Sequence, residues 1–152
     1  MKKILLFAIL SLCLILCLSS CTFLRSFFTE MEQEATKVAE FTQDMTQLMT
    51  NPTVEEAEKL VHPSSPLSPE AVIDKIKGNE KLANIDMSNL DIKEDVTVGD
   101  ITNLNISYHD ATLGGNIYTA DCEIVINGTP ILVKLKLLST DEGFGLYDFD
   151  LQ

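Results

Sequence analysis

The stretch YTADCEIVINGTPILVKLKL, residues 118–137, decides the fold. On both sides of Asn127-Gly128 apolar and polar side chains alternate with a period of two, which predicts strands buried on one face. Asn-Gly between two such runs is the strongest short signal for a two-residue hairpin turn. The turn fixes the register, which puts Asp121 opposite Lys134 on the polar face, a favourable cross-strand pair of charges. On the apolar face the expected pairs are Ile124 with Ile131, Cys122 with Val133 and Ala120 with Leu135.

The same period continues beyond this hairpin in both directions. Upstream, a strand is expected from Asp95 onward, in which Leu104, Ile106 and Tyr108 alternate with polar residues. Downstream, residues 139–143 turn the chain into a last strand. In that strand Tyr147, Phe149 and Leu151 are expected in the core, with Asp148 and Asp150 outward. The second half of the chain therefore predicts an antiparallel meander of about four strands.

Residues 24–49 instead repeat their apolar side chains with the helical period. Asn51-Pro52 is expected to end this first helix, because the residue before a proline avoids the helical region. The apolar stripe consists of Leu24, Phe27, Phe28, Met31, Ala35, Val38, Ala39, Met45, Leu48 and Met49.

Two shorter helices are expected next. Thr53 to Glu56 has the pattern of a capping box, and Ser68-Pro69-Glu70 starts a further helix that Gly78 ends. Their inward residues are expected to be Val54, Ala57, Leu60 and Val61 in the first, and Val72, Ile73 and Ile76 in the second. For residues 79–95 we expect a short helical turn near Leu82 and then an irregular or edge strand.

The amino terminus has the organisation of an export signal. Lys2 and Lys3 precede the apolar run of residues 4–18, which is shorter than the roughly 20 residues that span a bilayer comfortably. The run ends in Leu18-Ser19-Ser20-Cys21, which resembles the lipobox of bacterial lipoprotein signal peptides. The resemblance implies cleavage before Cys21, an S-diacylglycerol cysteine there, and a further acyl chain such as palmitate. An uncleaved anchor helix, or an ordinary signal with a chance cysteine, is the alternative.

This resemblance implies a domain organisation and a location. Residues 1–20 are the signal peptide that is removed, residues 21–27 are the lipidated cysteine with a membrane-proximal segment, and residues 28–152 form a single domain. The protein is then held on the extracytoplasmic side of the cell membrane, or on the outer membrane in a cell with two membranes. Two acyl chains anchor a protein stably, whereas one chain does not.

Charge and cysteine content narrow the functions further. The net charge is −12, and the removal of Lys2 and Lys3 with the signal makes it more negative. This excess of acid argues against binding to nucleic acid and against electrostatic adhesion to anionic lipid. Besides Cys21, the mature chain retains only Cys122, so an intramolecular disulfide is excluded. We interpret Cys122 as a small buried hydrophobic residue.

Helices followed by an antiparallel meander with one apolar face predict an α+β fold, with the N-terminal helices packed on one face of the sheet. The element order, and the ending from Leu135 through Phe144 to Leu151, resemble the cystatin-like and NTF2-like small lipoproteins, many of unknown function. The resemblance covers roughly residues 28–151 and concerns fold alone.

Residues that carry chemistry are few. His109 beside Asp110 is the weak catalytic candidate, because a histidine and an aspartate can act together as a general base. Neighbouring strand residues point to opposite faces, so the two would need a turn to converge. His62, at a helix end, is expected to cap carbonyls or to interact with the helix dipole.

No pattern of metal ligands or of a phosphate-binding loop appears, so we expect neither a metal nor a cofactor. Asp148 and Asp150 with Asp141-Glu142 are interpreted as a solvated acidic edge, and a weak cation site is the alternative.

Three functions follow as hypotheses. The first is a lipid-anchored module that binds an envelope protein or a small ligand, through the open sheet face or the loop of residues 109–117. The alternative is a small NTF2-like hydrolase or isomerase that uses His109 and Asp110 in a shallow pocket. The third is a structural accessory of the cell envelope.

Overall fold

The computed structural model describes residue 29 and residues 32–152. The chain divides into two compact units, Met1–Lys37 and Val38–Gln152. In the first unit, residue 29 and residues 32–37 are helical. The predicted signal peptide, its lipobox and Cys21 lie outside the described residues.

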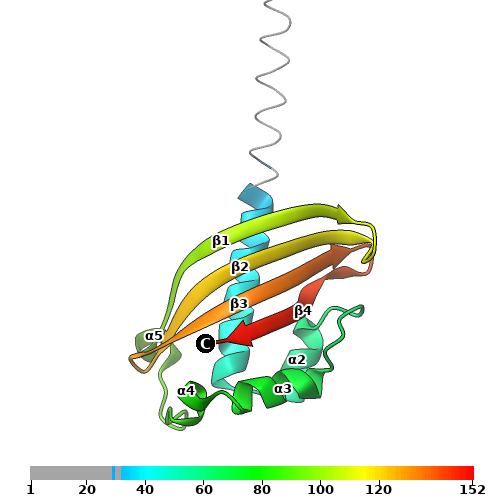
Figure 1. The fold of residues 1–152 in the computed structure, drawn as a ribbon. Helices are drawn as coiled ribbons and strands as arrows, with labels where there is room; N and C mark the ends of the chain where they lie inside the picture. Colours follow the sequence, from blue (N-terminus) through cyan, green and yellow to red (C-terminus); the bar gives the residue numbers. More distant parts are fainter. Residues whose placement is uncertain (1–28, 30–31) are drawn as a thin grey trace, which may run out of the picture. The chain divides into compact units, whose positions relative to one another are not determined.

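The second unit contains a four-stranded antiparallel sheet in the order β1-β2-β3-β4 (Figure 1). The strands are β1 (Val96–Asp110), β2 (Gly115–Ile126), β3 (Thr129–Thr140) and β4 (Gly143–Leu151). Each strand pairs with the next one along the chain, so the sheet is the predicted meander. Together with the helices it makes the fold α+β, as the sequence predicted.

The hairpin between β2 and β3 has the predicted register. Asn127 and Gly128 have φ values of 48° and 74°, the left-handed conformation that a tight two-residue turn requires. The predicted apolar pairs of this hairpin are all cross-strand partners. Asp121 lies opposite Lys134 as expected. The Asp121 carboxylate accepts a hydrogen bond from Asn103 Nδ2 at 2.7 Å, and no ion pair joins it to Lys134 in the described part of the chain.

The helices of this unit begin and end largely where the sequence predicted. Residues 38–50 are helical, and α2 (Val54–Leu60) and α3 (Pro69–Lys77) follow. Thr53 Oγ1 accepts from the N–H of Glu56 at 3.3 Å, and Ser68 Oγ accepts from the N–H of Ala71 at 3.2 Å. Gly78 caps the end of α3.

The segment between α3 and the sheet differs in part from the prediction. The helical turn at Leu82 is present as α4 (Glu80–Ala83), with Leu82 buried. The prediction of an irregular or edge strand after this turn is wrong, because a short helix, α5 (Ile92–Asp95), precedes β1. The reason is a local cap: Asp91 Oδ1 accepts from the N–H of Lys93 at 2.9 Å, and acidic side chains favour a helix N-terminus.

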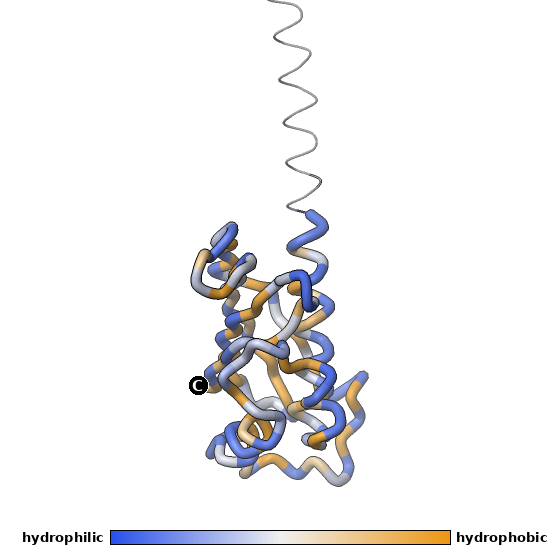
Figure 2. The backbone as a smooth tube through the Cα atoms, turned by 90° about the vertical axis from the view of Figure 1, so that its right-hand side faces the viewer, coloured by the Kyte–Doolittle hydropathy of each residue, from blue (hydrophilic) through white to orange (hydrophobic). Residues whose placement is uncertain are grey.

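The core lies between the helices and one face of the sheet. In the edge-on view of Figure 2 the helix of residues 38–50 lies on one side of the strands, along which hydrophobic and hydrophilic residues alternate. Phe41 from this helix contacts Phe144 of β4 edge to face, with ring centroids 6.0 Å apart, and Phe144 contacts Tyr118 of β2 in the same way. The fully buried members of the core include Val38, Met45, Ala57, Val72, Cys122, Ile124, Ile126, Ile131, Val133, Leu137 and Leu146.

Two predicted core residues are outside the core. Val54 is 38% exposed at the first turn of α2, so its assignment as inward is wrong. Tyr147 was expected in the core, but the register shifts between Lys136 and Leu137, which makes Tyr147 the additional residue of a β-bulge. Its ring instead lies under the Lys136 ammonium, with Nζ 4.8 Å from the ring centroid.

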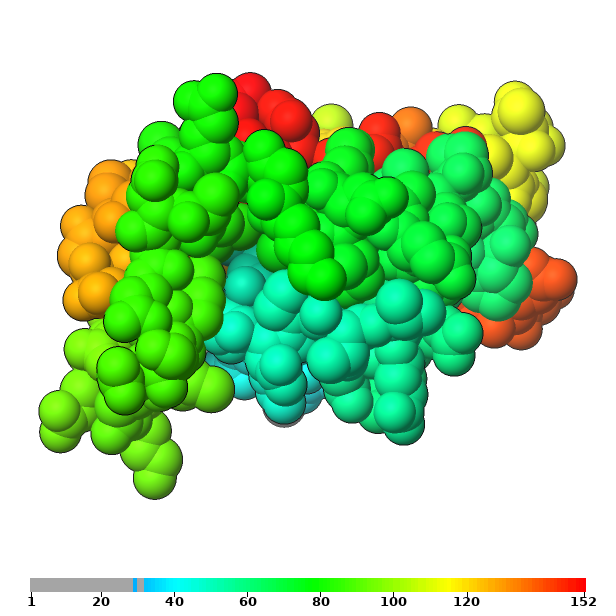
Figure 3. All heavy atoms as spheres, turned by 90° about the horizontal axis from the view of Figure 1, so that it is seen from below, coloured from blue at the N-terminus to red at the C-terminus, as the bar shows by residue number. Residues whose placement is uncertain are grey.

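Figure 3 shows the side of the unit that α2 and α3 cover. The turn before β2 (yellow) and the turn between β2 and β3 (orange) lie at opposite ends of this view. In Figure 1, α2 and α3 lie beside the β4 edge, and the helix of residues 38–50 lies behind the sheet. The other face of the sheet carries the outward side chains of β2, β3 and β4.

Candidate functional site

The structure places His109 and Asp110 at the end of β1 without joining them into a catalytic pair. His109 is exposed and has φ of 55°, and its backbone N–H donates to Asn116 Oδ1 at 2.7 Å. Asp110 Oδ1 accepts from the N–H groups of Thr112 and Leu113, at 2.9 and 3.0 Å, so the carboxylate holds the turn between β1 and β2. No hydrogen bond joins the two side chains within the described part of the chain.

His109 also lies away from the cavities. It lines none of the four cavities described below. Among residue 29 and residues 32–152, no cluster of three or more histidine, cysteine or acidic side chains could hold a metal ion. Asp110 does not line any of these four cavities either.

Cys122 lies in the core, as predicted from its position on the apolar face of β2. Burial raises the pKa of its thiol, and the nearby carboxylates of Asp100 and Glu123 raise it further. A thiol whose pKa is raised forms little thiolate, the species that attacks as a nucleophile. Cys122 is thus a packing residue.

His62 is buried, with only 2% of its surface exposed, and it does not cap helix carbonyls. Its Nδ1 accepts a hydrogen bond from the N–H of Ser64 at 3.0 Å, which places the ring proton on Nε2. Nε2 lies 3.0 Å from Thr140 Oγ1, at the end of β3. The expectation of a capping histidine is therefore corrected: His62 links the segment after α2 to the end of the β3–β4 hairpin.

The most prominent group of charged residues lies on the outward face of the sheet. Lys134 on β3 stands between Asp121 on β2 and Asp150 on β4, and the next outward position of β3, Lys136, has Asp148 as its partner on β4. These side chains line a shallow groove of about 320 Å³. The other lining residues are Thr119, Leu135 and Phe149. Two lysines of β3 thus lie between Asp121 of β2 and the two aspartates of β4 on one open surface.

One helix contributes to the edge of this groove. Lys75 of α3 reaches Asp148 Oδ1 at 3.0 Å and also donates to the carbonyl of Phe149 at 2.6 Å. Partial burial alone would raise the pKa of the Asp148 carboxyl. The hydrogen bonds from Lys75 and from the N–H of Phe149, with the charges of Lys75 and Lys136, outweigh it and lower that pKa. Asp148 is therefore held as a carboxylate.

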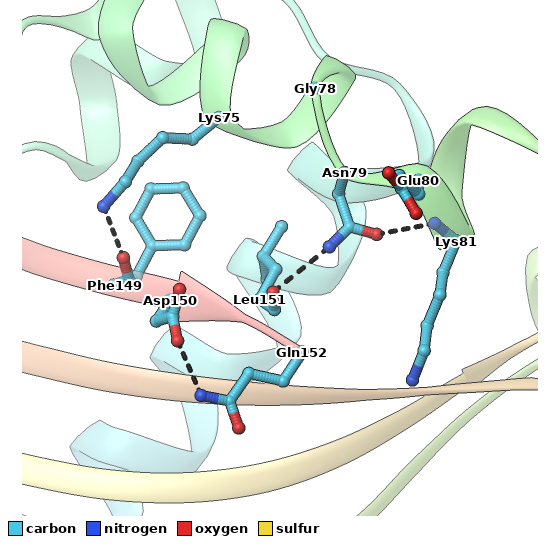
Figure 4. A pocket seen from close by; sticks show the side chains of 9 residues that line it. All are labelled: Lys75, Gly78, Asn79, Glu80, Lys81, Phe149, Asp150, Leu151 and Gln152. Atoms are coloured by element: carbon cyan, nitrogen blue, oxygen red, sulfur yellow. Dashed lines mark hydrogen bonds between the residues drawn. The ribbon is translucent and has the colours of Figure 1, made fainter.

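A larger cavity of about 420 Å³ lies beside the outer edge of β4 (Figure 4). Side chains reach this edge from the helical side of the unit: Lys75 from α3, and Asn79, whose Nδ2 donates to the carbonyl of Leu151 at 3.2 Å. Asp150 turns to Gln152, which donates to it from Nε2 at 2.8 Å. In the wall of this cavity, Lys75 and Asn79 therefore already donate hydrogen bonds to the edge of the sheet.

Two smaller cavities lie among the helices. One of about 170 Å³ is mostly apolar, between Met49, Ile76, Leu82 and Met87, and one of about 200 Å³ lies between the helix of residues 38–50 and α2. Neither contains a histidine or a cysteine. The first is lined mainly by apolar side chains, and the second also by Asp44, Glu56 and Lys59.

Comparison of the chain with models of protein families, with curated proteins and with solved structures gave no match. None of the helices among the described residues is both long enough and apolar enough to cross a membrane. The chemistry of the surface must therefore be interpreted from this chain alone.

The groove on the outward sheet face can recognise a ligand by charge and hydrogen bonding. The sequence identified part of it, since the hairpin register put Asp121 opposite Lys134 and the last strand put Asp148 and Asp150 outward. The sequence did not identify Lys75, because nothing in the pattern of α3 indicates that its last turn meets β4. Its only signal was a lysine in the last turn of a helix, which the helix dipole favours in general.

Proposed function

We propose that this chain is an exported lipoprotein, held by lipid on Cys21 at the extracytoplasmic side of the cell membrane, whose second unit is a binding or assembly module for an envelope protein or a small ligand. In a cell with two membranes, the outer membrane is the alternative location. The anchor is supported by Leu18-Ser19-Ser20-Cys21 after a short apolar run with two preceding lysines.

The proposal extends to the fold group. A helix across one face of a four-stranded antiparallel meander is the arrangement that we expect of a cystatin-like or NTF2-like domain. Domains of this kind serve many functions, so the group supports a scaffold and leaves the function to the surface residues.

The observation that carries the binding role is the charged groove on the outward sheet face. The helix of residues 38–50 lies on the opposite face, and Lys75 of α3 reaches the groove only at its edge, through Asp148. Five charged side chains from three strands line the groove: Asp121, Lys134, Lys136, Asp148 and Asp150. Alternating charges on an open surface select a partner by complementary potential and orientation.

Photo-crosslinking in intact cells tests this role. A photoreactive amino acid would replace Lys134 or Asp148 in the groove, and, as the matched control, exposed Glu58 on α2. We expect one recurrent adduct from the two groove positions that is absent from the control position. If the groove positions give no adduct beyond the control, the groove is not the site of a protein partner.

A further inference from the structure

The two edges of the sheet differ in how their backbone groups are satisfied. Along the outer edge of β4, side chains from other elements cap successive outward carbonyls. Tyr147 O accepts from Ser65 Oγ at 2.8 Å, Phe149 O from Lys75 Nζ at 2.6 Å, and Leu151 O from Asn79 Nδ2 at 3.2 Å. This edge is closed to another strand, which is how soluble sheets avoid association.

Among the described residues, none caps the outer edge of β1 in this way. Within the described part of the chain, every side-chain hydrogen bond that involves a residue of β1 is made inside the β1–β2 hairpin and its turn. In an antiparallel strand at an edge, alternate residues turn their N–H and C=O groups away from the neighbouring strand. No side chain in the described part of the chain occupies these groups of β1.

Exposed apolar side chains gather on the same strand. Three of the five exposed large hydrophobic residues in the described part of the chain lie on β1: Val98 (39% exposed), Leu104 (37%) and Tyr108 (58%). Exposed apolar residues with free backbone groups are the features that a strand-adding partner uses for affinity and specificity.

The charges on this side of the sheet are of one sign. β1 and β2 carry Asp100, Asp110, Asp121 and Glu123, and neither strand contains a lysine or an arginine. Lysine is the residue that natural sheets most often place on an edge to prevent strand addition. Its absence, with this acidic surround, favours a partner segment that carries basic side chains.

β-Bulges limit where a strand could be added. The register of β1 shifts at three places, between Val98 and Ile101, between Thr102 and Asn105, and between Ser107 and Asp110. Bulges twist an edge and interrupt pairing. One regular stretch, Asn105–Ser107, lies between the exposed side chains of Leu104 and Tyr108.

We propose that the outer edge of β1 at residues 104–108 binds an extended, basic peptide segment of a partner protein, which adds to the sheet as a short fifth strand. Backbone hydrogen bonds to the regular stretch would hold the segment, Leu104 and Tyr108 would contact its apolar side chains, and Asp100 and Asp110 would attract its basic ones. This site goes beyond the proposed function, because it is a sheet edge separate from the groove, and variants of one leave the other intact.

The test is amide hydrogen exchange of the full chain in lipid nanodiscs, measured by mass spectrometry. The probe is a synthetic peptide of about ten residues, the length of a typical long strand, with alternating valine and threonine and lysines at both ends. We expect it to slow exchange in residues 104–108 by about threefold or more, as strand addition requires. The same peptide with glutamates in place of the lysines should give little protection.

Matched variants make the test specific. Leu104→Lys and Tyr108→Lys each place a cation on the edge at an exposed position, and each should abolish the protection. Val54→Lys makes the same change at a position of similar exposure on α2 and should leave the protection intact. Unchanged exchange elsewhere in each variant shows that it has folded.

Three results would overturn the proposal. The first is no protection of β1 by the lysine peptide at millimolar concentration, and the second is equal protection by the glutamate peptide. The third is protection of β1 that rises with protein concentration in the absence of peptide, because that identifies a second copy of the chain as the occupant of the edge.

Discussion

At the scale of single residues, His62 shows how a polar side chain is buried at little cost. Both ring nitrogens lie within hydrogen-bond distance of a partner, and the ring joins Ser64 to Thr140 across two segments far apart in the sequence. When one partner of a buried hydrogen bond is removed, the other partner stays unsatisfied. This costs more free energy than the hydrogen bond itself contributed. We therefore assign His62 a structural role.

Replacing His62 tests this assignment. His62→Ala should lower the free energy of unfolding by about 2–4 kcal/mol, because it removes a buried side chain and its hydrogen bonds with Ser64 N–H and Thr140 Oγ1. Urea unfolding of the purified chain measures the loss. The matched control is His109→Ala, at an exposed position, which should change stability by no more than about 0.5 kcal/mol. Equal effects of the two variants would contradict the role of His62.

Asp148 makes a weaker contribution to the stability of the fold, and this contribution depends on pH. The folded-state pKa of its carboxyl is lowered, so its stabilisation is present above the unfolded-state value and is lost as pH falls through the folded-state value. The side chain is 51% exposed, so solvent screening limits this contribution to about 0.5 kcal/mol.

Asp148→Asn should therefore be slightly less stable than the parent chain at neutral pH. The difference should start to shrink near pH 4, the ordinary range of an aspartate pKa, and should vanish at lower pH. Urea unfolding over a series of pH values measures it. A difference that stays constant down to the acid limit would mean that Asp148 does not stabilise the fold as a carboxylate.

At the scale of elements, β4 approaches the segment after α2 closely, next to the bulge in that strand. A Cβ atom on Gly145 would lie 2.8 Å from Leu60 O and 2.9 Å from His62 N, both backbone atoms that cannot move independently. Next to it, Leu146 O accepts the N–H of His62 at 2.9 Å. The segment of residues 60–62 thus packs directly against the backbone of β4.

Gly145→Ala should separate these two elements. We expect a loss of about 2 kcal/mol or more in stability, because the added methyl group meets backbone on two sides. Gly114→Ala is the comparison: its added Cβ meets no atom within 4 Å, but the residue has φ of 69°, so it should lose only the roughly 1–2 kcal/mol of a left-handed residue. Thermal unfolding ranks the two, and additional loss of amide protection at residues 60–62 is expected for Gly145→Ala alone. Retained protection there would contradict the packing account.

These elements also show which parts of the fold could be predicted from the sequence. The register of β2 and β3 could be predicted because Asn127-Gly128 fixes it locally, and the helix starts could be predicted because Thr53 and Ser68 act within their own turn. The close approach of residues 60–62 to Gly145 could not, because it joins segments that are far apart in the sequence. The contact of Lys75 with Asp148 is missed for the same reason: it joins elements 73 residues apart.

At the scale of the whole molecule, the described residues support the proposed binding surfaces, and the amino-terminal sequence supports the proposed lipid anchor. The second unit supplies a sheet with a charged open face and one uncapped edge. The amino-terminal sequence, a short apolar run that ends in Leu18-Ser19-Ser20-Cys21, is the basis on which we propose an export signal. We propose that the lipid on Cys21 holds the molecule at the membrane, while its open surfaces meet other components of the envelope. Its net charge of −12 argues against attachment to anionic lipid by charge alone.

The most direct test of the lipid anchor is the intact mass of the chain purified from membranes, together with fragmentation of its amino-terminal peptide. We predict that the chain begins at Cys21 and carries a diacylglyceryl group on Sγ, and that Cys21→Ser abolishes both cleavage and lipid while the protein is still exported. A mature chain that begins elsewhere, or that begins at Cys21 without lipid, would contradict the account.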